Sequence, residues 1–380
     1  MWSKYHKKEN KVKHKCFHIQ CFAIFATAMY NTTNEKASRQ VAVWLLIGVG
    51  MIIIQVLLGG ITRLTESGLS ITEWKPITGA LPPMNEVAWQ AEFDRYKITD
   101  QFKYVHQNFS LADFKFIFFW EWFHRLWARL MGMVFLIGFI YFIATKKFKQ
   151  QMIAPMVILF ILGGLQGAIG WLMVKSGLVP EKYFVGHIEL TTHLIAALIL
   201  LCYTLWFALS LLIKPQQQIV NKPLQKLLLT ITIIFFFQLI YGGFMAGIKA
   251  AVVAPTWPDI NGAFIPAEIG ELSPAIKNIF YNPLTIHFIH RGLAYLLFVL
   301  VLMWWFKSNR IKNNLLFIRL RLGFLLLIVL QMLLGILTVM NATYTNRLVW
   351  LGVSHQFTAM ILLMVLVGLL FIVKKRPAGY

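Results

Sequence analysis

Charged residues are scarce in this sequence. Only 13% of its 380 residues are Asp, Glu, Lys or Arg, whereas 58% are hydrophobic. A soluble domain of this length could not bury so much apolar surface, but a lipid bilayer can cover it. The scarcity of charge therefore excludes a water-soluble globular protein and favours a membrane protein.

Acidic residues are rarer still. The chain has 15 Asp and Glu against 36 Lys and Arg, which gives a formal net charge of +21. The basic residues lie in short runs between apolar spans, a distribution that is typical of membrane orientation and offers no groove for phosphates. The charge pattern therefore predicts a lipid bilayer as partner and no nucleic acid.

Cysteine is also rare, with only Cys16, Cys21 and Cys202 in the chain. None lies in a connection that we expect outside the membrane, so no disulfide framework is predicted. None has a partner at the spacing of a zinc site or of c-type haem attachment, so covalently bound haem is not expected.

Long apolar runs, in contrast, are abundant, and eight of them provide the roughly 20 residues that a membrane span needs. Each must be helical, because an unpaired backbone group in lipid is too costly. The predicted fold class is an all-α membrane protein with eight transmembrane helices. The expected spans are 41–60, 118–144, 152–174, 187–213, 226–248, 284–306, 316–340 and 351–373.

The connections between spans predict the orientation. One set carries many basic residues and no acid, whereas the opposite short loops mix both signs. Because basic loops stay in the cytoplasm, both termini are expected inside and the long segment 61–117 outside, with helices lying on the membrane surface. The basic set is Lys146, Lys147, Lys149, Lys214, Lys222, Lys226, Lys307, Arg310, Lys312, Arg319, Arg321, Lys374, Lys375 and Arg376.

The two ends are expected to be cytoplasmic tails, 1–40 and 374–380. Residues 1–28 are basic and then weakly apolar, which fits a targeting segment or a spurious extension with Met29 as the true start. They are not the Arg- and Ser-rich kind that directs mitochondrial import. We therefore expect a bacterial plasma membrane rather than the mitochondrial inner membrane.

The chain is an internal duplication. Gln55-x-x-x-Gly59 recurs as Gln238-x-x-x-Gly242, and His124-Arg125 recurs as His290-Arg291. Further pairs follow in the same order: Trp74 and Trp257, Gly79 and Gly262, Gln166 and Gln331, Gly170 and Gly335, His193 and His355, Ala197 and Ala359. This order predicts two parallel four-helix repeats, 41–213 and 226–373, related by an axis along the membrane normal.

The recurring glutamines have two readings. A glutamine four residues before a glycine can serve only in helix packing, where the small residue allows close approach and the amide forms a hydrogen bond. It can also line a cofactor pocket. The sequence leaves both readings open.

Four histidines stand on the second, fourth, sixth and eighth spans: His124, His193, His290 and His355. All four spans run inward from the outer side, so the histidines are expected at similar depth in the outer leaflet. Ionisable residues inside a membrane are functional by default. Two pairs of neutral imidazoles across a bundle core suit the axial positions of haem iron, and no neighbouring residues complete a zinc or copper site.

The two halves differ beside these histidines. Glu121 stands three residues before His124, whereas His287 holds the equivalent place before His290. Residues three apart share a helix face, so Glu121 is expected to face the same cavity as His124. A carboxylate at a haem edge can accept protons or stabilise positive charge, which predicts chemistry in the first half and electron transfer in the second.

Three arginines close to these histidines are candidates for pairing with haem propionates or for anchoring the helices at the membrane interface. They are Arg125, Arg129 and Arg291.

At these residues the sequence closely resembles the haem A synthase family, over about residues 40–375. The matching stretches are GGITRLTESGLSITEWKPITGALPP (59–83), EFDRYK (92–97), FKFIFFWEWFHRLWARLMG (114–132), THLIAAL (192–198), HFIHRGLAY (287–295) and SHQFTA (354–359). The sequence looks like the subtype that lacks cysteine pairs in the outer loops, so the electron route proposed for those pairs does not carry over.

The resemblance implies oxidation of the C8 methyl group of haem O to the formyl group of haem A, by successive hydroxylations and loss of water. It implies that Glu121, His124 and His193 form the substrate haem site and that His290 and His355 bind a haem b cofactor. A haem O synthase would supply the substrate. A haem–copper terminal oxidase or its assembly factors would receive the product.

Two other functions compete with haem A synthesis. A di-haem b-type cytochrome that carries electrons would keep the four histidines but has no need for Glu121. A haem transporter or delivery protein built on repeats would expose a path and convert nothing. The sequence names neither the electron acceptor nor the oligomeric state, and a homo-oligomer stays open.

Overall fold

The structure, a computed structural model, describes residues 35–73 and 78–374. The expectations about residues 1–28, Cys16, Cys21, Trp74, Lys375 and Arg376 therefore lie outside the described residues. Within them, eight helices are long and apolar enough to cross a membrane, as the sequence predicts. They are the first helix (Glu35–Leu64), α4 (Leu111–Ala144), α5 (Gln150–Gly177), α6 (His187–Leu212), α7 (Lys222–Gly247), α10 (Pro283–Ser308), α11 (Leu315–Met340) and α12 (Thr345–Ile372).

Polar caps fix where several of these helices begin. The side chains of Asn221, Asn282 and Asn314 accept hydrogen bonds from backbone N–H groups in the first turns of α7, α10 and α11. Ser110 and Asp113 form a capping box that starts α4 at Leu111, well before the apolar run begins. These bonds satisfy N–H groups that a helix leaves without partners at its start.

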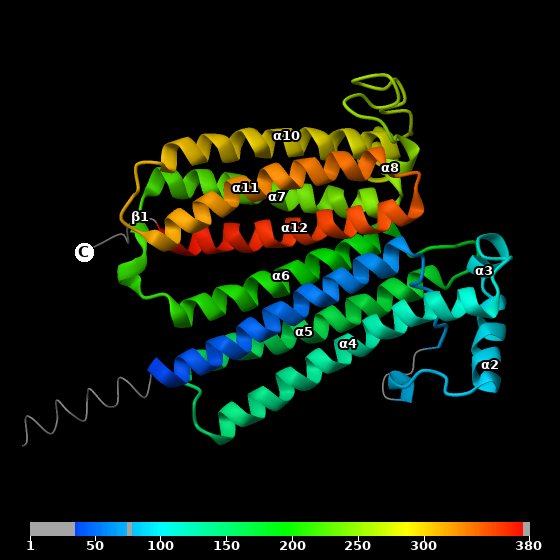
Figure 1. The fold of residues 1–380 in the computed structure, drawn as a ribbon, viewed down its shortest axis with the longest axis horizontal. Helices are drawn as coiled ribbons and strands as arrows, with labels where there is room; N and C mark the ends of the chain where they lie inside the picture. The colour runs from blue at the N-terminus through cyan, green and yellow to red at the C-terminus, as the bar shows by residue number, and fades with distance from the viewer. Residues whose placement is uncertain (1–34, 74–77, 375–380) are drawn as a thin grey trace, which may run out of the picture.

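The helices lie side by side in two groups. In Figure 1 the first helix, α4, α5 and α6 form the lower group, and α7, α10, α11 and α12 form the upper group. The groups meet where α6 packs against α7 and α12. Fully buried side chains such as Leu201, Leu228 and Leu366 fill this interface. The fold is an all-α, multi-pass membrane protein.

The long first connection is folded at one end of the bundle. It contains η1 (Thr78–Ala80), α2 (Glu86–Lys97) and α3 (Asp100–Tyr104). Figure 1 shows α2 running across the direction of the membrane helices. Phe93 and Tyr96 of α2 stack on Phe114 near the start of α4, which fastens the connection to the bundle. That these helices lie along the membrane surface stays a prediction.

Shorter elements complete the connections. The second long connection holds α8 (Ala250–Val253), η3 (Ala275–Lys277) and α9 (Asn278–Tyr281) at the same end as α2 and α3. At the other end, η2 (Pro215–Gln217) precedes β1 (Ile219–Val220), which pairs in parallel with β2 (Val373–Lys374).

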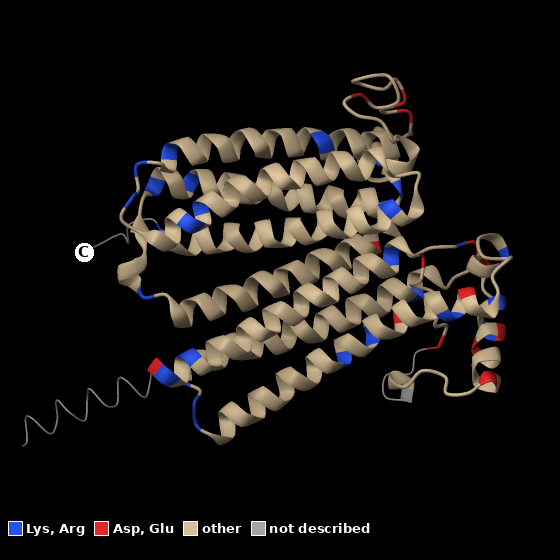
Figure 2. Ribbon diagram, viewed as in Figure 1, with Lys and Arg blue, Asp and Glu red and all other residues tan. Residues whose placement is uncertain are grey.

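Charge is divided between the two ends of the bundle. Figure 2 shows basic residues in the turns at the end where the described chain starts and stops. Apart from Glu35, the acids gather around the opposite end, on α2, α3 and the two long connections. The structure thus places the basic loops of the sequence together on one side of the membrane helices.

Candidate haem-binding site

The four histidines that the sequence predicts as ligands line one cavity of about 1020 Å³, which extends through both helix groups. His124 lies on α4, His193 on α6, His290 on α10 and His355 on α12. Two of the histidines therefore come from each helix group, and all four line the same cavity.

Each histidine faces a glycine of the preceding membrane helix. A Cβ atom on Gly170 would lie 2.7 Å from Cε1 of His193, and one on Gly335 would lie 3.1 Å from Cε1 of His355. The equivalent distances are 3.3 Å from Gly242 to Cε1 of His290 and 3.5 Å from Gly59 to Nε2 of His124. The glycines therefore make the room in which the imidazole rings lie.

Glu121 is buried, with 2% of its surface exposed, although the cavity reaches it. Its Oε2 atom accepts hydrogen bonds from the Ser70 hydroxyl at 2.7 Å and the Ile71 backbone N–H at 2.8 Å. Its Oε1 atom accepts one from Nη2 of Arg125 at 2.5 Å. Three donors fix the orientation of this buried carboxylate.

The equivalent place in the second half has a different polar group. His287 is fully buried, and its Nε2 atom accepts a hydrogen bond from Nε of Arg291 at 2.9 Å. Arg291 also donates to the backbone carbonyls of Thr256, Pro258 and Asp259. The asymmetry that the sequence predicts therefore lies at the cavity wall.

The three arginines predicted beside the haem line the cavity. Arg125 donates to Glu121 and to the Ile71 carbonyl, and Arg291 donates to His287 and the loop carbonyls. Both side chains thus fasten the outer connections to their helices. Arg129 lies one turn beyond Arg125 on α4.

Polar contacts next to the cavity join the two helix groups at the end of the bundle that carries α2 and α3. Arg63 donates to the Gly247 carbonyl at 2.7 Å, and Lys249 forms an ion pair with Glu66. The Phe184 ring lies between the two cations, 4.3 Å from Nζ of Lys249 and 5.5 Å from the Arg63 guanidinium.

Glu66 is also bound to His106, whose Nε2 atom lies 3.4 Å from Oε2 of the carboxylate. The hydrogen bond from His106, together with Lys249, lowers the pKa of Glu66 to about 2, despite the opposing effect of burial. The Tyr96 hydroxyl lies 2.7 Å from Nδ1 of His106, and burial raises the pKa of Tyr96. His106 is therefore a buried residue that links Glu66 to Tyr96.

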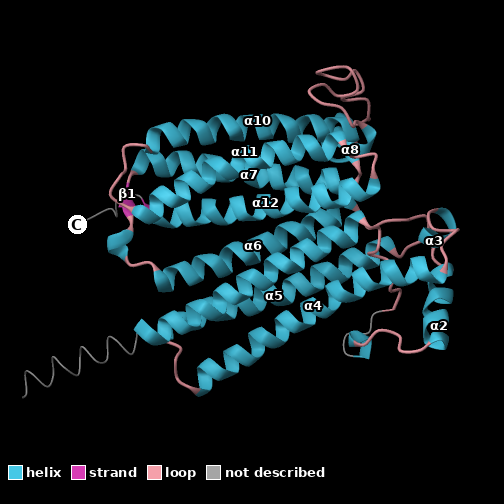
Figure 3. Ribbon diagram, viewed as in Figure 1, coloured by secondary structure: helices cyan, strands magenta, loops and turns pink. Residues whose placement is uncertain are grey.

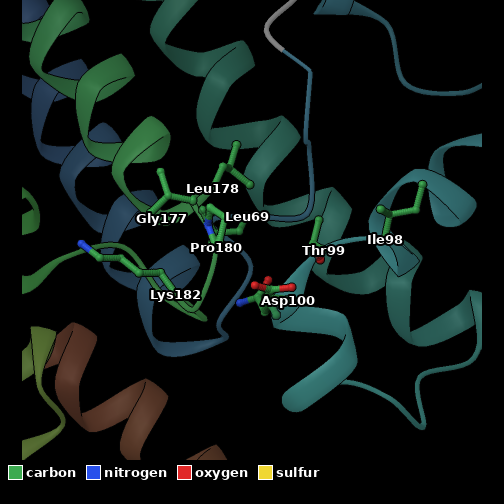
Figure 4. A pocket seen from close by; sticks show the side chains of 10 residues that line it. Leu69, Ile98, Thr99, Asp100, Gly177, Leu178, Pro180 and Lys182 are labelled. Atoms are coloured by element: carbon green, nitrogen blue, oxygen red, sulfur yellow. The ribbon is translucent and has the colours of Figure 1, made fainter.

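A second, smaller cavity of about 200 Å³ lies between α3 and the connection after α5 (Figure 4). Its wall includes Thr99, Asp100 and Lys182 but none of the histidines. In the described ranges, no three His, Cys, Asp or Glu side chains converge as they would around a metal ion. The four histidines of the large cavity therefore remain the candidate iron ligands that the sequence predicts.

Sequence reasoning missed Ser70 and the Ile71 backbone N–H, although both lie in the stretch 59–83 that carries the resemblance. It also gave no role to Glu66, whose partner Lys249 comes from the other repeat. The polar residues of the stretch 59–83 could have been recognised as candidates for contacts, but nothing in the sequence shows which helix this stretch contacts.

Comparison with known proteins agrees with this geometry. The family model described as cytochrome oxidase assembly protein matches residues 42–367. A heme A synthase of Parvibaculum lavamentivorans is 42% identical over 73% of this chain and 80% of its own. Those of Flavobacterium psychrophilum and Paracoccus denitrificans are 39% and 37% identical, over 86% and 88% of this chain and 96% and 88% of their own. This chain therefore belongs to the cytochrome oxidase assembly family that contains the haem A synthases.

Proposed function

We propose that the protein is a haem A synthase, an oxidoreductase that converts the C8 methyl group of haem O into the formyl group of haem A. The observation that carries this proposal is the buried Glu121 carboxylate beside only one of two histidine pairs in a shared cavity. An electron carrier needs two ligand pairs but no such carboxylate. The relatives named heme A synthase support the same activity.

The first half, 41–213 with its outer segment 61–117, is proposed to hold the substrate. His124 and His193 would bind the iron of haem O, and Glu121 would lie beside its edge. Because Ser70, Ile71 and Arg125 fix the carboxylate in place, its negative charge is preorganised to stabilise positive charge that develops on the carbon during oxidation. It can also receive a proton lost from that carbon.

The conversion needs two successive hydroxylations of one carbon. The first gives an alcohol and the second a geminal diol, which loses one water to leave the formyl group. Written as a half-reaction, the methyl group and one net water lose four protons and four electrons, and an external electron acceptor must take up the electrons. Glu121 would be the group of this chain that acts at that carbon.

The second half, 226–373, is proposed to hold a haem b cofactor between His290 and His355. Neutral imidazoles suit haem iron, and the shared cavity of about 1020 Å³ reaches both histidines of this half. The bound haem would supply one-electron transfer. His287 and Arg291 would anchor the adjoining loop, and Arg129 with Arg125 and Arg291 would provide positive charge for propionates.

We further propose that the protein lies in a bacterial plasma membrane with both termini in the cytoplasm, because the basic turns share one end of the bundle. The substrate would come from a haem O synthase, and the product would pass to a haem–copper terminal oxidase or its assembly factors.

Co-expression with a haem O synthase, in a host that makes no haem A, tests the function. We expect haem A, identified by its shifted pyridine haemochrome spectrum and by its mass. The haem O synthase expressed alone is the control. Accumulation of haem O only, with both histidine pairs loaded, would favour the electron-carrying cytochrome instead.

A further inference from the structure

We propose that the glutamines of the Gln-x-x-x-Gly segments are positioning residues that orient the iron-binding histidines and select which ring nitrogen faces the iron. This inference rests on the proposed haem function. It assigns a role to Gln166, Gln238 and Gln331 on α5, α7 and α11.

Each of these three amides contacts the histidine of the next membrane helix. Nε2 of Gln166 lies 3.3 Å from Nδ1 of His193 and also donates to its backbone carbonyl at 3.1 Å. Nε2 of Gln238 lies 3.3 Å from Nε2 of His290, and Nε2 of Gln331 lies 3.2 Å from Nε2 of His355. The contact thus recurs in both repeats, which a packing device alone would not require.

The glycine of each segment presses on the same ring one turn later. A Cβ atom on Gly170, Gly242 or Gly335 would lie 2.7–3.3 Å from Cε1 of the facing histidine. Side chains four residues apart lie on one face of a helix, so the glutamine and glycine hold the ring from one helix. Each histidine ring thus contacts the glutamine amide and also lies against the backbone at the glycine.

The amide oxygens are the second observation. Oε1 of Gln55, Gln166, Gln238 and Gln331 is buried without a hydrogen-bond partner, and so is Nδ1 of His290 and His355. A buried carbonyl without a donor is costly. A half-turn of the amide exchanges its oxygen and nitrogen, so that the oxygen accepts an N–H from the imidazole.

Iron binding requires the arrangement in which the amide oxygen accepts the N–H of the imidazole. An imidazole that binds a metal uses the lone pair of one nitrogen and keeps its proton on the other, which donates to a nearby acceptor. The glutamine oxygen is the acceptor within reach. By holding the N–H, it fixes both the tautomer and the plane of the ring.

The first helix differs from the other three. Among the described residues, Gln55 makes no hydrogen bond to His124, and Gly59 stands farther from that ring than the other glycines do from theirs. His124 is therefore the least constrained of the four.

Purified haem-loaded protein tests the inference independently of haem A formation. We expect Gln238→Leu to release haem b to excess apomyoglobin about 10- to 100-fold faster than wild type, since that is the usual cost of losing an outer partner of a metal ligand. The electron paramagnetic resonance signal of the ferric haem should also broaden and shift, because the ring plane is no longer fixed.

Gln238→Glu restores a hydrogen-bond acceptor for His290, so haem b should again be released as slowly as from wild type. The reduction potential of the haem should be lower than in wild type, because a carboxylate makes the histidine ligand more basic. Gln225→Leu, on the same helix but near its other end, is the matched control and should behave as wild type. Equal release rates and spectra for Gln238→Leu and Gln225→Leu would overturn the inference. Absence of haem from the wild type would do so too.

Discussion

Glu121 and His287 occupy equivalent places, three residues before an iron-binding candidate in each half. Each accepts a hydrogen bond from the arginine one turn later, Arg125 or Arg291. The arginines and their loop contacts are thus shared by the halves, and only the group that they hold differs. At the scale of single residues, the proposed division between chemistry in the first half and electron transfer in the second rests on this one difference.

Glu121→Gln should keep bound haem but lower haem A formation by about 10²-fold or more, as removal of a preorganised polar group does. The neutral amide keeps the shape of the side chain and removes its charge. Pigment analysis should show haem O or a hydroxylated intermediate. Glu86→Gln, at an exposed position of α2, is the control. Full activity of Glu121→Gln would refute the carboxylate role.

His290→Ala should remove the haem b of the second half while the helices persist. The haem content per chain, measured by pyridine haemochrome, should fall by the share of that site, and circular dichroism should not change. Gln225→Leu serves again as a control on the preceding helix α7. An unchanged haem content would show that His290 is not a ligand.

At the scale of helices, each iron-binding candidate is held by a neighbour that precedes it in the chain. The pairs are the first helix with α4, α5 with α6, α7 with α10, and α11 with α12. The distance from glycine to ring differs among these pairs and increases from Gly170 to Gly335, Gly242 and Gly59. Tolerance of an added Cβ atom should therefore be lowest at Gly170 and highest at Gly59.

Gly170→Ala should reduce haem at the first site most strongly, because its Cβ would force the His193 ring to move. Gly335→Ala and Gly242→Ala should have smaller effects, in that order. Gly323→Ala on α11, where a Cβ meets nothing within 4 Å, is the control. Haem content of each purified variant checks the order, and equal contents across the set would contradict it.

The sequence was sufficient to predict the number of membrane helices and the histidines that they carry, because apolar length and a repeated motif are local signals. It placed helix starts less well. The helices α4 and α12 begin at Leu111 and Thr345 rather than near residues 118 and 351, since polar residues extend each helix beyond its apolar run. The contacts of Glu121 with Ser70 and Ile71 depend on how a long connection folds back, which no local pattern encodes.

At the scale of the whole molecule, the two helix groups are joined by a junction that consists of Glu66, Lys249, Arg63 and the Phe184 ring. These contacts join residues that are far apart in the sequence. The residues of the junction also line the cavity.

The junction should lose stability in acid. The pKa of Glu66 is about 2 in the folded protein, below its ordinary value of 4.5, so its stabilising effect is present above pH 4.5 and lost as the pH falls from 4.5 towards 2. His106, Lys249, Tyr96 and Arg63 are the titratable groups around it.

Thermal unfolding in detergent checks this expectation. Glu66→Gln should be less stable than wild type at neutral pH and should lose less stability between pH 4.5 and 2. Glu268→Gln, in the exposed second connection, should follow wild type. If wild type and Glu66→Gln lost the same stability between pH 4.5 and 2, Glu66 would not stabilise the junction.

The cavity that both histidine pairs line has a further consequence. A porphyrin bound in one half would change the polarity of the wall that it shares with the other, and the surroundings of an iron set how readily it takes up an electron. Arrival of the substrate should therefore change the electron affinity of its neighbour. By thermodynamic reciprocity, the oxidation state of that neighbour should alter substrate affinity by the same factor.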